Sequence, residues 1–360
     1  MSAFGSVFAA RGVACGATLL GVMLMSRHVG RAGYGQLVLL LTIMKVAAEF
    51  AGPALDTALV RFAAHDEPRA LRYAGAILWM KLILCAGVLA AGLVAAKPLQ
   101  SLLFNGAAPA GAPGVPAWAV TLACVGAGFA MLWAFAQAWF QAHQQFKRYA
   151  GFECAGAAIR LVLVAAVVGA AAFLSWHRTT SIVLLLAAYV AAAGALMGAT
   201  WAHLPRGLFA KPARLQDVGQ DLLHFTKWVF AACCFTTLAN RADIFLINWL
   251  KLPGEAVGDY AGAVHLVLVG DLVILSLFNV LLPKASGLRT ADEMARFLKQ
   301  FRKPAALAGI GVIPLVLGSK VLARIALGPE FIQTGALFSV LVLGALLSLG
   351  CAPAGTVLYG

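Results

Sequence analysis

The sequence has few charged residues and especially few acids. Only 11% of its 360 residues are charged, with 14 Asp and Glu against 27 Lys and Arg, whereas 62% are hydrophobic. A soluble domain carries about 25% charged residues because its surface must face water, so this composition excludes a soluble globular protein and also intrinsic disorder. The basic residues do not form the dense polar stripe that binds nucleic acid, so we expect no nucleic-acid partner.

Motifs for common cofactors and catalytic chemistry are also missing. The sequence has no Gly-Lys pair and hence no GxxxxGK[ST] phosphate loop, and it has no HExxH or GxSxG motif. Its seven cysteines lie in apolar stretches and show no metal-ligand spacing. We therefore expect no metal, no cofactor and no ATP hydrolysis. A membrane glycosyltransferase would be expected to carry a large outer loop, but the longest one, 97–116, is small and apolar, so we do not expect an enzyme.

Long apolar runs, by contrast, dominate the chain. A bilayer core requires about 20 predominantly apolar residues per helix. Ten segments meet this requirement, at 3–25, 34–60, 73–96, 116–142, 152–176, 182–202, 225–249, 260–283, 304–326 and 334–358. The first run has no preceding basic region, so it predicts a retained span and not a cleavable signal. The sequence therefore predicts an all-α, polytopic membrane protein with about ten transmembrane helices.

Basic residues in the loops set the expected orientation. The loops after even-numbered spans carry most of the loop Lys and Arg, and the most basic of them follows the eighth span. Positive charge is retained on the cytoplasmic side of a membrane. We therefore expect the N-terminus and the even-numbered loops in the cytoplasm. The basic, proline-punctuated segment 203–224 is typical of a cytoplasmic linker between two halves.

An internal repeat relates the two halves at an offset of 223 residues. The aligned pairs are Gly35 with Gly258, Asp56 with Asn279, Arg61 with Lys284, and Lys97 with Lys320. Because six spans separate equivalent positions, the repeats have the same orientation, as in one class of transporters. We expect a six-helix bundle at 1–202, the linker at 203–224 and a second bundle at 225–360. The repeat predicts two further helices in the second bundle, so we expect that bundle to be truncated at four helices and the sequence to be a fragment.

Four segments carry a family resemblance. They are SRHVGRAGYGQLVLLL (26–41), GPALDTALVRFAAHD (52–66), DIFLINWLKLPGEAVGDYAGAVHLV (243–267) and NVLLPKASGL (279–288). They resemble the polysaccharide-export and O-antigen flippase family of the multidrug/oligosaccharidyl-lipid/polysaccharide exporter superfamily. In that family a first helix ends in an "lGpeeyG" turn, a second ends in "lgtALvR", and the pattern returns at helices seven and eight. The resemblance covers essentially the whole chain.

The resemblance implies two six-helix bundles that face a central cavity in a bacterial inner membrane. It implies transfer of lipid-linked oligosaccharide, on an undecaprenyl pyrophosphate carrier, from the cytoplasmic to the periplasmic leaflet. The product would serve polysaccharide or lipopolysaccharide O-antigen biosynthesis, with polysaccharide polymerase machinery as a partner. Family members usually have twelve or more spans, and this chain departs from them by ending at ten.

Basic residues within the expected spans are the candidate substrate contacts. A charge at the bilayer centre costs about 2.5–3.5 kcal/mol on insertion scales and usually faces a bundle interior or a wet cavity. We expect Arg11, Lys45 and Arg241 to contact the pyrophosphate, because basic side chains supply charge-assisted hydrogen bonds to phosphate. The alternative is an ion pair, for Lys45 with Glu49 one turn away and for Arg241 with Asp271.

Titratable residues within the spans are the candidates for coupling transport to a proton or sodium gradient. They are Glu49, Asp243, His265 and Asp271. The other charged residues of the spans are expected to have structural roles. We expect packing between helices for Glu153 and Arg160, an interfacial position for Asp56, and snorkelling toward the inner headgroups for Lys81.

Three functions follow from these patterns. The leading hypothesis is a flippase for lipid-linked polysaccharide units, with basic groups lining its cavity. The first alternative is a cation-coupled multidrug or metabolite antiporter of the same superfamily, whose cavity would be dominated by acids. The second is a membrane assembly subunit without transport, in which every buried charge would be paired.

Overall fold

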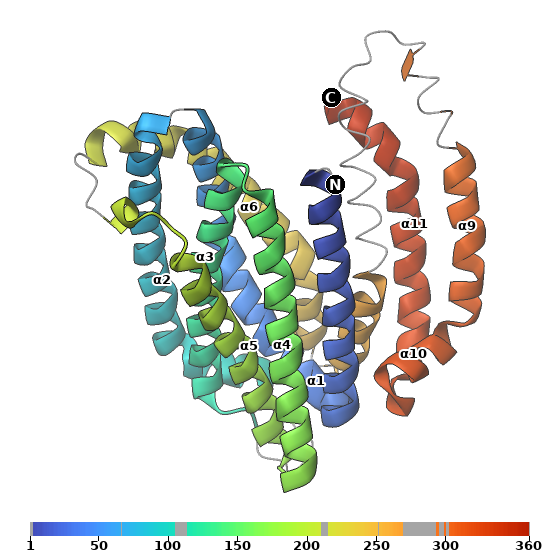
Figure 1. Ribbon diagram of the computed structural model, residues 1–360. Coiled ribbons are helices and arrows are strands. Elements are labelled where there is room, and N and C mark those ends of the chain that lie inside the picture. Colours follow the sequence, from blue (N-terminus) through green and yellow to red (C-terminus); the bar gives the residue numbers. More distant parts are fainter. Residues whose placement is uncertain are drawn as a thin grey trace. The chain divides into compact units, whose positions relative to one another are not determined.

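The computed structural model describes residues 3–65, 67–104, 114–209, 215–250, 252–268, 293–294, 299 and 302–359. Within these ranges every regular element is a helix, and none is a strand (Figure 1). Seven of the described helices are long and apolar enough to cross a membrane, or eight if one bent pair forms a single span. The expected all-α, polytopic membrane fold is therefore confirmed. The division into six and four helices stays a prediction.

Helix α1 (Ala3–His65) contains the first two expected spans. Its 63 residues would measure about 95 Å at 1.5 Å per residue, far more than the roughly 30 Å of a bilayer core. The helix is interrupted at Gly30, where φ is 69° and ψ is 178°. Only glycine adopts this conformation readily. The break at Gly30 thus separates the two spans that hydropathy predicts.

The chain divides into two compact units. Unit 1 comprises Met1–Ala14 and Ala32–Gly258, and unit 2 comprises Cys15–Arg31 and Asp259–Gly360. The chain passes from one unit to the other inside α1, next to the break at Gly30.

Unit 1 contains four helices after α1 and then a fifth that follows a short 3₁₀ turn. They are α2 (Glu67–Phe104), α3 (Ala117–Ala142), α4 (Phe146–Leu174), α5 (Arg178–Trp201), η1 (Arg206–Phe209) and α6 (Leu215–Trp249). These helices match the third to seventh expected spans. One core cluster of unit 1 is built from apolar side chains of α1, α2 and α3, and it extends to Leu208 of η1 and Leu222 of α6.

Two segments of unit 1 approach each other closely at a glycine contact. A Cβ atom on Gly35 would lie 2.5 Å from the carbonyl oxygen of Gly254 and 2.9 Å from the nitrogen of Gly258. The two backbones approach this closely only because neither residue has a side chain at the contact. Gly35 and Gly258 are also the pair that the repeat aligns.

Unit 2 contains the second part of the first span and the C-terminal helices. A helix that starts at residue 254 continues to residue 268, and it is followed by α9 (Arg302–Leu317), α10 (Ser319–Leu327), η2 (Pro329–Phe331) and α11 (Thr334–Tyr359). The ninth expected span is bent by 64° between α9 and α10. The core of unit 2 includes a cluster of Ala263, Phe338 and Val342. Only the first part of the eighth expected span lies within the described residues.

Candidate functional site

Three basic side chains of unit 1, from three different helices, lie near one another together with one acid. Lys45 and Glu49 lie on α1, Arg160 on α4 and Arg241 on α6. Lys45 interacts electrostatically with both arginines and with Glu49. The Nη2 atom of Arg241 lies 3.6 Å from Oε1 of Glu49. We call these four residues the basic cluster; it has more positive than negative groups.

The basic cluster leaves donors available for a ligand. The Nε of Arg241 is buried and has no hydrogen-bond partner among the described residues. Arg160 Nε donates to the carbonyl oxygen of Gly156 at 3.3 Å, and its charge acts on Tyr189 of α5. Lys45 is exposed, and Glu49 keeps 40% of its side-chain surface accessible. An anion could therefore reach two guanidinium groups and an ammonium group together.

The structure brings together two of the three expected anion contacts. Lys45 and Arg241 lie in one cluster, and the acid beside them is Glu49, one of the residues expected to serve ion coupling. Arg160, which was expected to pack between helices, belongs to this cluster as well. Glu153, for which the same role was expected, accepts a hydrogen bond from Gln137 Nε2 at 3.3 Å.

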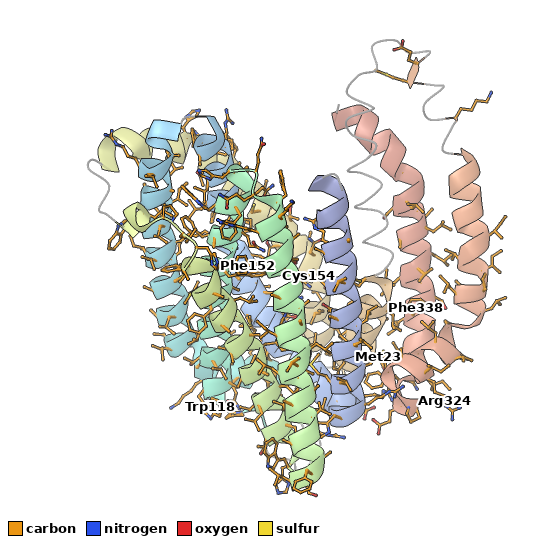
Figure 2. All side chains as sticks on the ribbon, viewed as in Figure 1. Met23, Trp118, Phe152, Cys154, Arg324 and Phe338 are labelled. Atoms are coloured by element: carbon orange, nitrogen blue, oxygen red, sulfur yellow. The ribbon has the colours of Figure 1, made fainter. Side chains whose placement is uncertain are left out.

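Arg11 lies on the part of α1 that belongs to unit 1, and it is exposed. The carbonyl oxygen of its neighbour Ala10 accepts a hydrogen bond from Cys154 Sγ of α4 at 3.8 Å. Figure 2 labels Cys154 on this helix. Arg160 is six residues farther along α4, about 9 Å along the helix axis. Arg11 therefore lies beside the same helix that contributes Arg160.

The other candidates for ion coupling have local hydrogen bonds. Asp243 Oδ1 accepts from the backbone N–H of Ile244 at 2.8 Å, and His265 Nδ1 lies 2.7 Å from the carbonyl oxygen of Ala261. Asp271 lies outside the described residues. Among the residues that are described, no group of three His, Cys, Asp or Glu side chains could hold a metal ion.

A buried ion pair links helices α1, α2 and α3 of unit 1. Lys81 Nζ of α2 donates to Asp56 Oδ1 of α1 at 2.5 Å and to the carbonyl oxygen of Met131 of α3 at 2.9 Å. The Lys81 side chain is 0% exposed. The expected snorkelling of Lys81 to the headgroups is therefore wrong, and Asp56 is its partner in an ion pair between α1 and α2. Span assignment does not reveal which helices face each other, so the sequence did not identify this pair.

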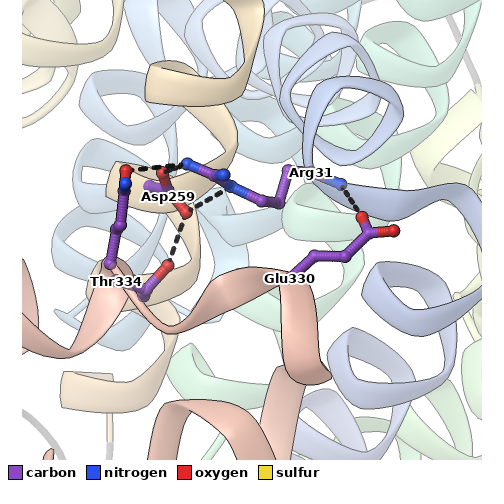
Figure 3. A network of polar contacts seen from close by, with 5 residues as sticks. Arg31, Asp259, Glu330 and Thr334 are labelled. Carbon is purple, nitrogen blue, oxygen red and sulfur yellow. Dashed lines mark hydrogen bonds and ion pairs between the residues drawn. The ribbon is translucent and has the colours of Figure 1, made fainter. Parts of the chain in front are cut away.

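The second polar centre is a network of hydrogen bonds within unit 2. Glu330, one of its residues, also lines a cavity of about 430 Å³ in that unit. Arg31 forms two hydrogen bonds to the carboxylate of Asp259, which also accepts one from Thr334 Oγ1 at 2.8 Å. The backbone N–H of Arg31 reaches Glu330 Oε2 at 3.4 Å (Figure 3). Sequence analysis missed this network, although Arg31 and Asp259 lie in two of the segments that carry the family resemblance.

Unit 1 also contains a cavity with a volume of about 610 Å³. Its walls come from α1, α3, α4 and α6. They include the acids Asp56 and Glu153, the base Arg61, and the aromatic residues Trp133, Tyr149 and Phe225.

Comparison with known proteins gives a family and a fold. The family model described as "Polysaccharide biosynthesis protein" matches residues 3–288. No curated protein sequence matches the chain. The fold is similar to that of an inward-facing multidrug resistance MATE family transporter of the MOP superfamily, with a TM-score of 0.63 and 16% identity over 95% of this chain and 81% of that one.

Two further solved structures are similar in fold. An outward-facing multidrug resistance MATE family transporter has a TM-score of 0.59 and 16% identity, covering 99% of this chain and 82% of that one. A MOP superfamily transporter from Pyrococcus furiosus has a TM-score of 0.61 and 13% identity, covering 99% and 94%. The latter is described as having a binding pocket of reverse polarity that suggests a different function.

Proposed function

Because the chain belongs to the polysaccharide biosynthesis protein family, we propose that it is a flippase for lipid-linked oligosaccharide units. In this proposal it moves units carried on a polyprenyl pyrophosphate from the cytoplasmic to the periplasmic leaflet of a bacterial inner membrane. Its N-terminus is cytoplasmic, and it performs no covalent chemistry on its substrate. The polysaccharide or O-antigen polymerase machinery would receive the product.

The observation that carries this proposal is the excess of positive charge in the basic cluster. A pyrophosphate must leave water to cross the bilayer, and the cost of desolvating an anion falls when fixed cations replace its hydration shell. Arginine is suited to this task because it stays charged and offers several donors in a fixed geometry. Arg160, Arg241 and Lys45 together provide more positive charge than Glu49 neutralises.

The mechanism follows from the chemistry of the two ends of the substrate. The pyrophosphate and sugars would enter the polar interior, while the polyprenyl tail stays in lipid. Transporters with like-oriented repeats alternate access by moving one repeat against the other around a central site. Substrate can drive such a change only if it binds the two states with different affinity. In the empty protein, Glu49 would form the ion pair with Arg241. When substrate binds, the pyrophosphate would replace Glu49 as the partner of Arg241.

The similarity to MATE family structures favours one alternative, a cation-coupled antiporter of drugs or metabolites. A site for an organic cation needs an excess of carboxylates. Glu49 is the acid of the basic cluster, and it is outnumbered by the basic groups around it. The third function, an assembly subunit without transport, predicts paired charges throughout, whereas the basic cluster has three basic groups for one acid.

Depletion of the protein in its host tests the proposal. Lipid-linked sugar is expected to accumulate in the inner leaflet, and the wild-type chain is expected to reverse the accumulation. Arg241→Ala and Lys45→Ala should not reverse it, whereas Arg178→Ala, at the start of α5 and outside the basic cluster, should. Full rescue by both cluster variants at wild-type expression would show that the proposed site is wrong.

A further inference from the structure

We propose that the cavity of unit 1 binds the sugar residues of the substrate, as a site separate from the basic cluster. The cavity has a volume of about 610 Å³, within the range of pockets that bind small molecules. It is lined by residues of α1, α3, α4 and α6. This inference rests on the proposed function, because a flippase of this kind must accommodate a glycan as well as a pyrophosphate.

The charges at the cavity balance, in contrast to those of the basic cluster. Asp56 is paired with Lys81 at 2.5 Å, and the remaining acid and base are Glu153 and Arg61. The guanidinium of Arg61 lies over the ring of Phe225, 4.4 Å from its centroid. A cavity with balanced, engaged charges suits a neutral polar ligand better than an ion.

Two buried polar atoms at the cavity lack a hydrogen-bond partner among the described residues. They are Nε1 of Trp133, a donor, and Oε1 of Gln137, an acceptor. The Gln137 residue is 7% exposed, and its Nε2 is held by Glu153 at 3.3 Å, which fixes the direction of the amide. A buried polar group without a partner is costly. Sugar hydroxyl groups can donate and accept, so they complement both atoms at once.

The aromatic walls of the cavity complete the chemistry for a sugar. Trp133, Tyr149 and Phe225 line the cavity and offer apolar aromatic surface, against which the C–H groups of a sugar can pack. Phe225 also contacts Phe62 edge to face, with 5.8 Å between ring centroids. Apolar faces with a few fixed polar groups are the usual composition of a small-molecule site.

The position of the cavity along the helices agrees with the expected orientation. Arg61 closes the second expected span, and Tyr149 precedes the fifth, so both lie at the end predicted to face the cytoplasm. The cavity is lined by the last part of α3 and the first turns of α4, whereas Trp118 lies at the start of α3, below Phe152 in the view of Figure 2. Lys45 and Arg61 are 16 residues apart on α1, about 24 Å at 1.5 Å per residue. The sugars would thus lie nearer the cytoplasm than the pyrophosphate.

Lipid binding to the purified full-length chain in nanodiscs tests this inference. The probes are undecaprenyl pyrophosphate and the same lipid carrying glucose, galactose or N-acetylglucosamine. At least one sugar-bearing lipid should bind about tenfold more tightly than the bare lipid, as two or so new hydrogen bonds predict. Gln137→Leu and Trp133→Phe should bring that ratio to about one and leave the affinity for the bare lipid unchanged.

Matched variants control for effects on folding. Gln100→Leu changes a glutamine that bonds Val115, and Trp118→Phe changes an exposed tryptophan of α3; neither residue lines the cavity, so both should keep the wild-type ratio. Arg241→Ala should weaken binding of all the lipids by the same factor. This common factor tests the pyrophosphate site, whereas the ratio between lipids tests the cavity.

Any different outcome of the lipid-binding experiment contradicts one specific part of the proposal. If every sugar-bearing lipid binds no better than the bare lipid, the cavity is not a sugar site and the pyrophosphate site stands. Equal loss of affinity for all lipids in Gln137→Leu would make that residue structural only. Stabilisation by sodium ions without a sugar effect would assign the cavity to a cation. If no lipid binds at all, both the proposed function and the sugar site are wrong.

Discussion

At the scale of single residues, the buried charge of Lys81 is paired with an acid. Lys81 is fully buried and holds both Asp56 and a carbonyl of α3. Breaking such a pair from one side leaves the other charge uncompensated, whereas removing both can be nearly neutral. This asymmetry separates the pair at Lys81 from the basic cluster, in which positive charge exceeds negative charge.

We expect Lys81→Met to destabilise unit 1 by about 3–5 kcal/mol, because Asp56 loses its buried partner. The double variant Lys81→Met with Asp56→Leu should recover most of that loss. Thermal unfolding of the four proteins of this cycle in one detergent measures the coupling. Additive losses, with no recovery in the double variant, would mean that the two side chains do not form the pair described above.

Tryptophan nitrogen atoms offer a second comparison between residues. Trp133 Nε1 is buried and has no hydrogen-bond partner in the described part of the chain, whereas Trp201 Nε1 donates to the carbonyl oxygen of Leu132 at 3.4 Å. Replacement by phenylalanine removes similar volume at both positions. We expect Trp201→Phe to be the more destabilising change, by about 1 kcal/mol, as measured by midpoints of thermal unfolding. The reverse order would show that Trp133 has a partner in the protein.

At the scale of helices, hydropathy predicted most of what the structure shows. The third to seventh expected spans correspond to α2–α6, and the tenth corresponds to α11. The sequence did not predict the 64° bend between α9 and α10, because a break at Gly318 leaves the apolar composition of the span unchanged. It also could not predict the faces that meet, since the rotation of each helix is set by packing.

Arg160 illustrates this limit for the candidate site. Its spacing from Glu153 places both residues on one face of a helix, which suggested packing, and the sequence contains no signal that this face turns toward Lys45. Arg241 was expected to have either the substrate or Asp271 as its partner, and the structure shows Glu49 beside it. Polar residues within spans could therefore be found from the sequence, but their partners could not.

Gly35 provides a test of the helix contact in unit 1. A Cβ at this position would lie 2.5 Å from a backbone oxygen and 2.9 Å from a backbone nitrogen, and neither can move aside. We expect Gly35→Ala to cost about 1–3 kcal/mol through overpacking. Gly12→Ala, with no atom within 4 Å of its Cβ, is the matched control and should not destabilise. Equal unfolding midpoints for the two variants would contradict this packing.

At the scale of the whole molecule, the chain passes between its two units within α1. Residues 15–31 belong to unit 2, where Arg31 is bound by Asp259 and by the segment that precedes α11. Residues from 32 onward belong to unit 1. The chain thus leaves unit 1 after Ala14 and returns to it at Ala32, two residues after the break at Gly30.

Gly30 should therefore tolerate no side chain. Its φ of 69° with ψ of 178° lies in a region that is essentially restricted to glycine, and a side chain there costs about 1–3 kcal/mol. We expect Gly30→Ala to lower both stability and transport, whereas Gly21→Ala, which adds a Cβ in open space, should affect neither. Wild-type unfolding and wild-type rescue by Gly30→Ala would rule out the break as described.

Leaflet transfer in proteoliposomes tests the central claim most directly. The measured quantity is the rate at which undecaprenyl pyrophosphate bearing a sugar crosses vesicles that contain the purified chain. The account predicts transfer well above that of protein-free vesicles, retained by Arg178→Ala and lost in Lys45→Ala and Arg241→Ala. Transfer equal to that of protein-free vesicles, or equal in all variants, would contradict a flippase that offsets the charge of a pyrophosphate with its basic cluster.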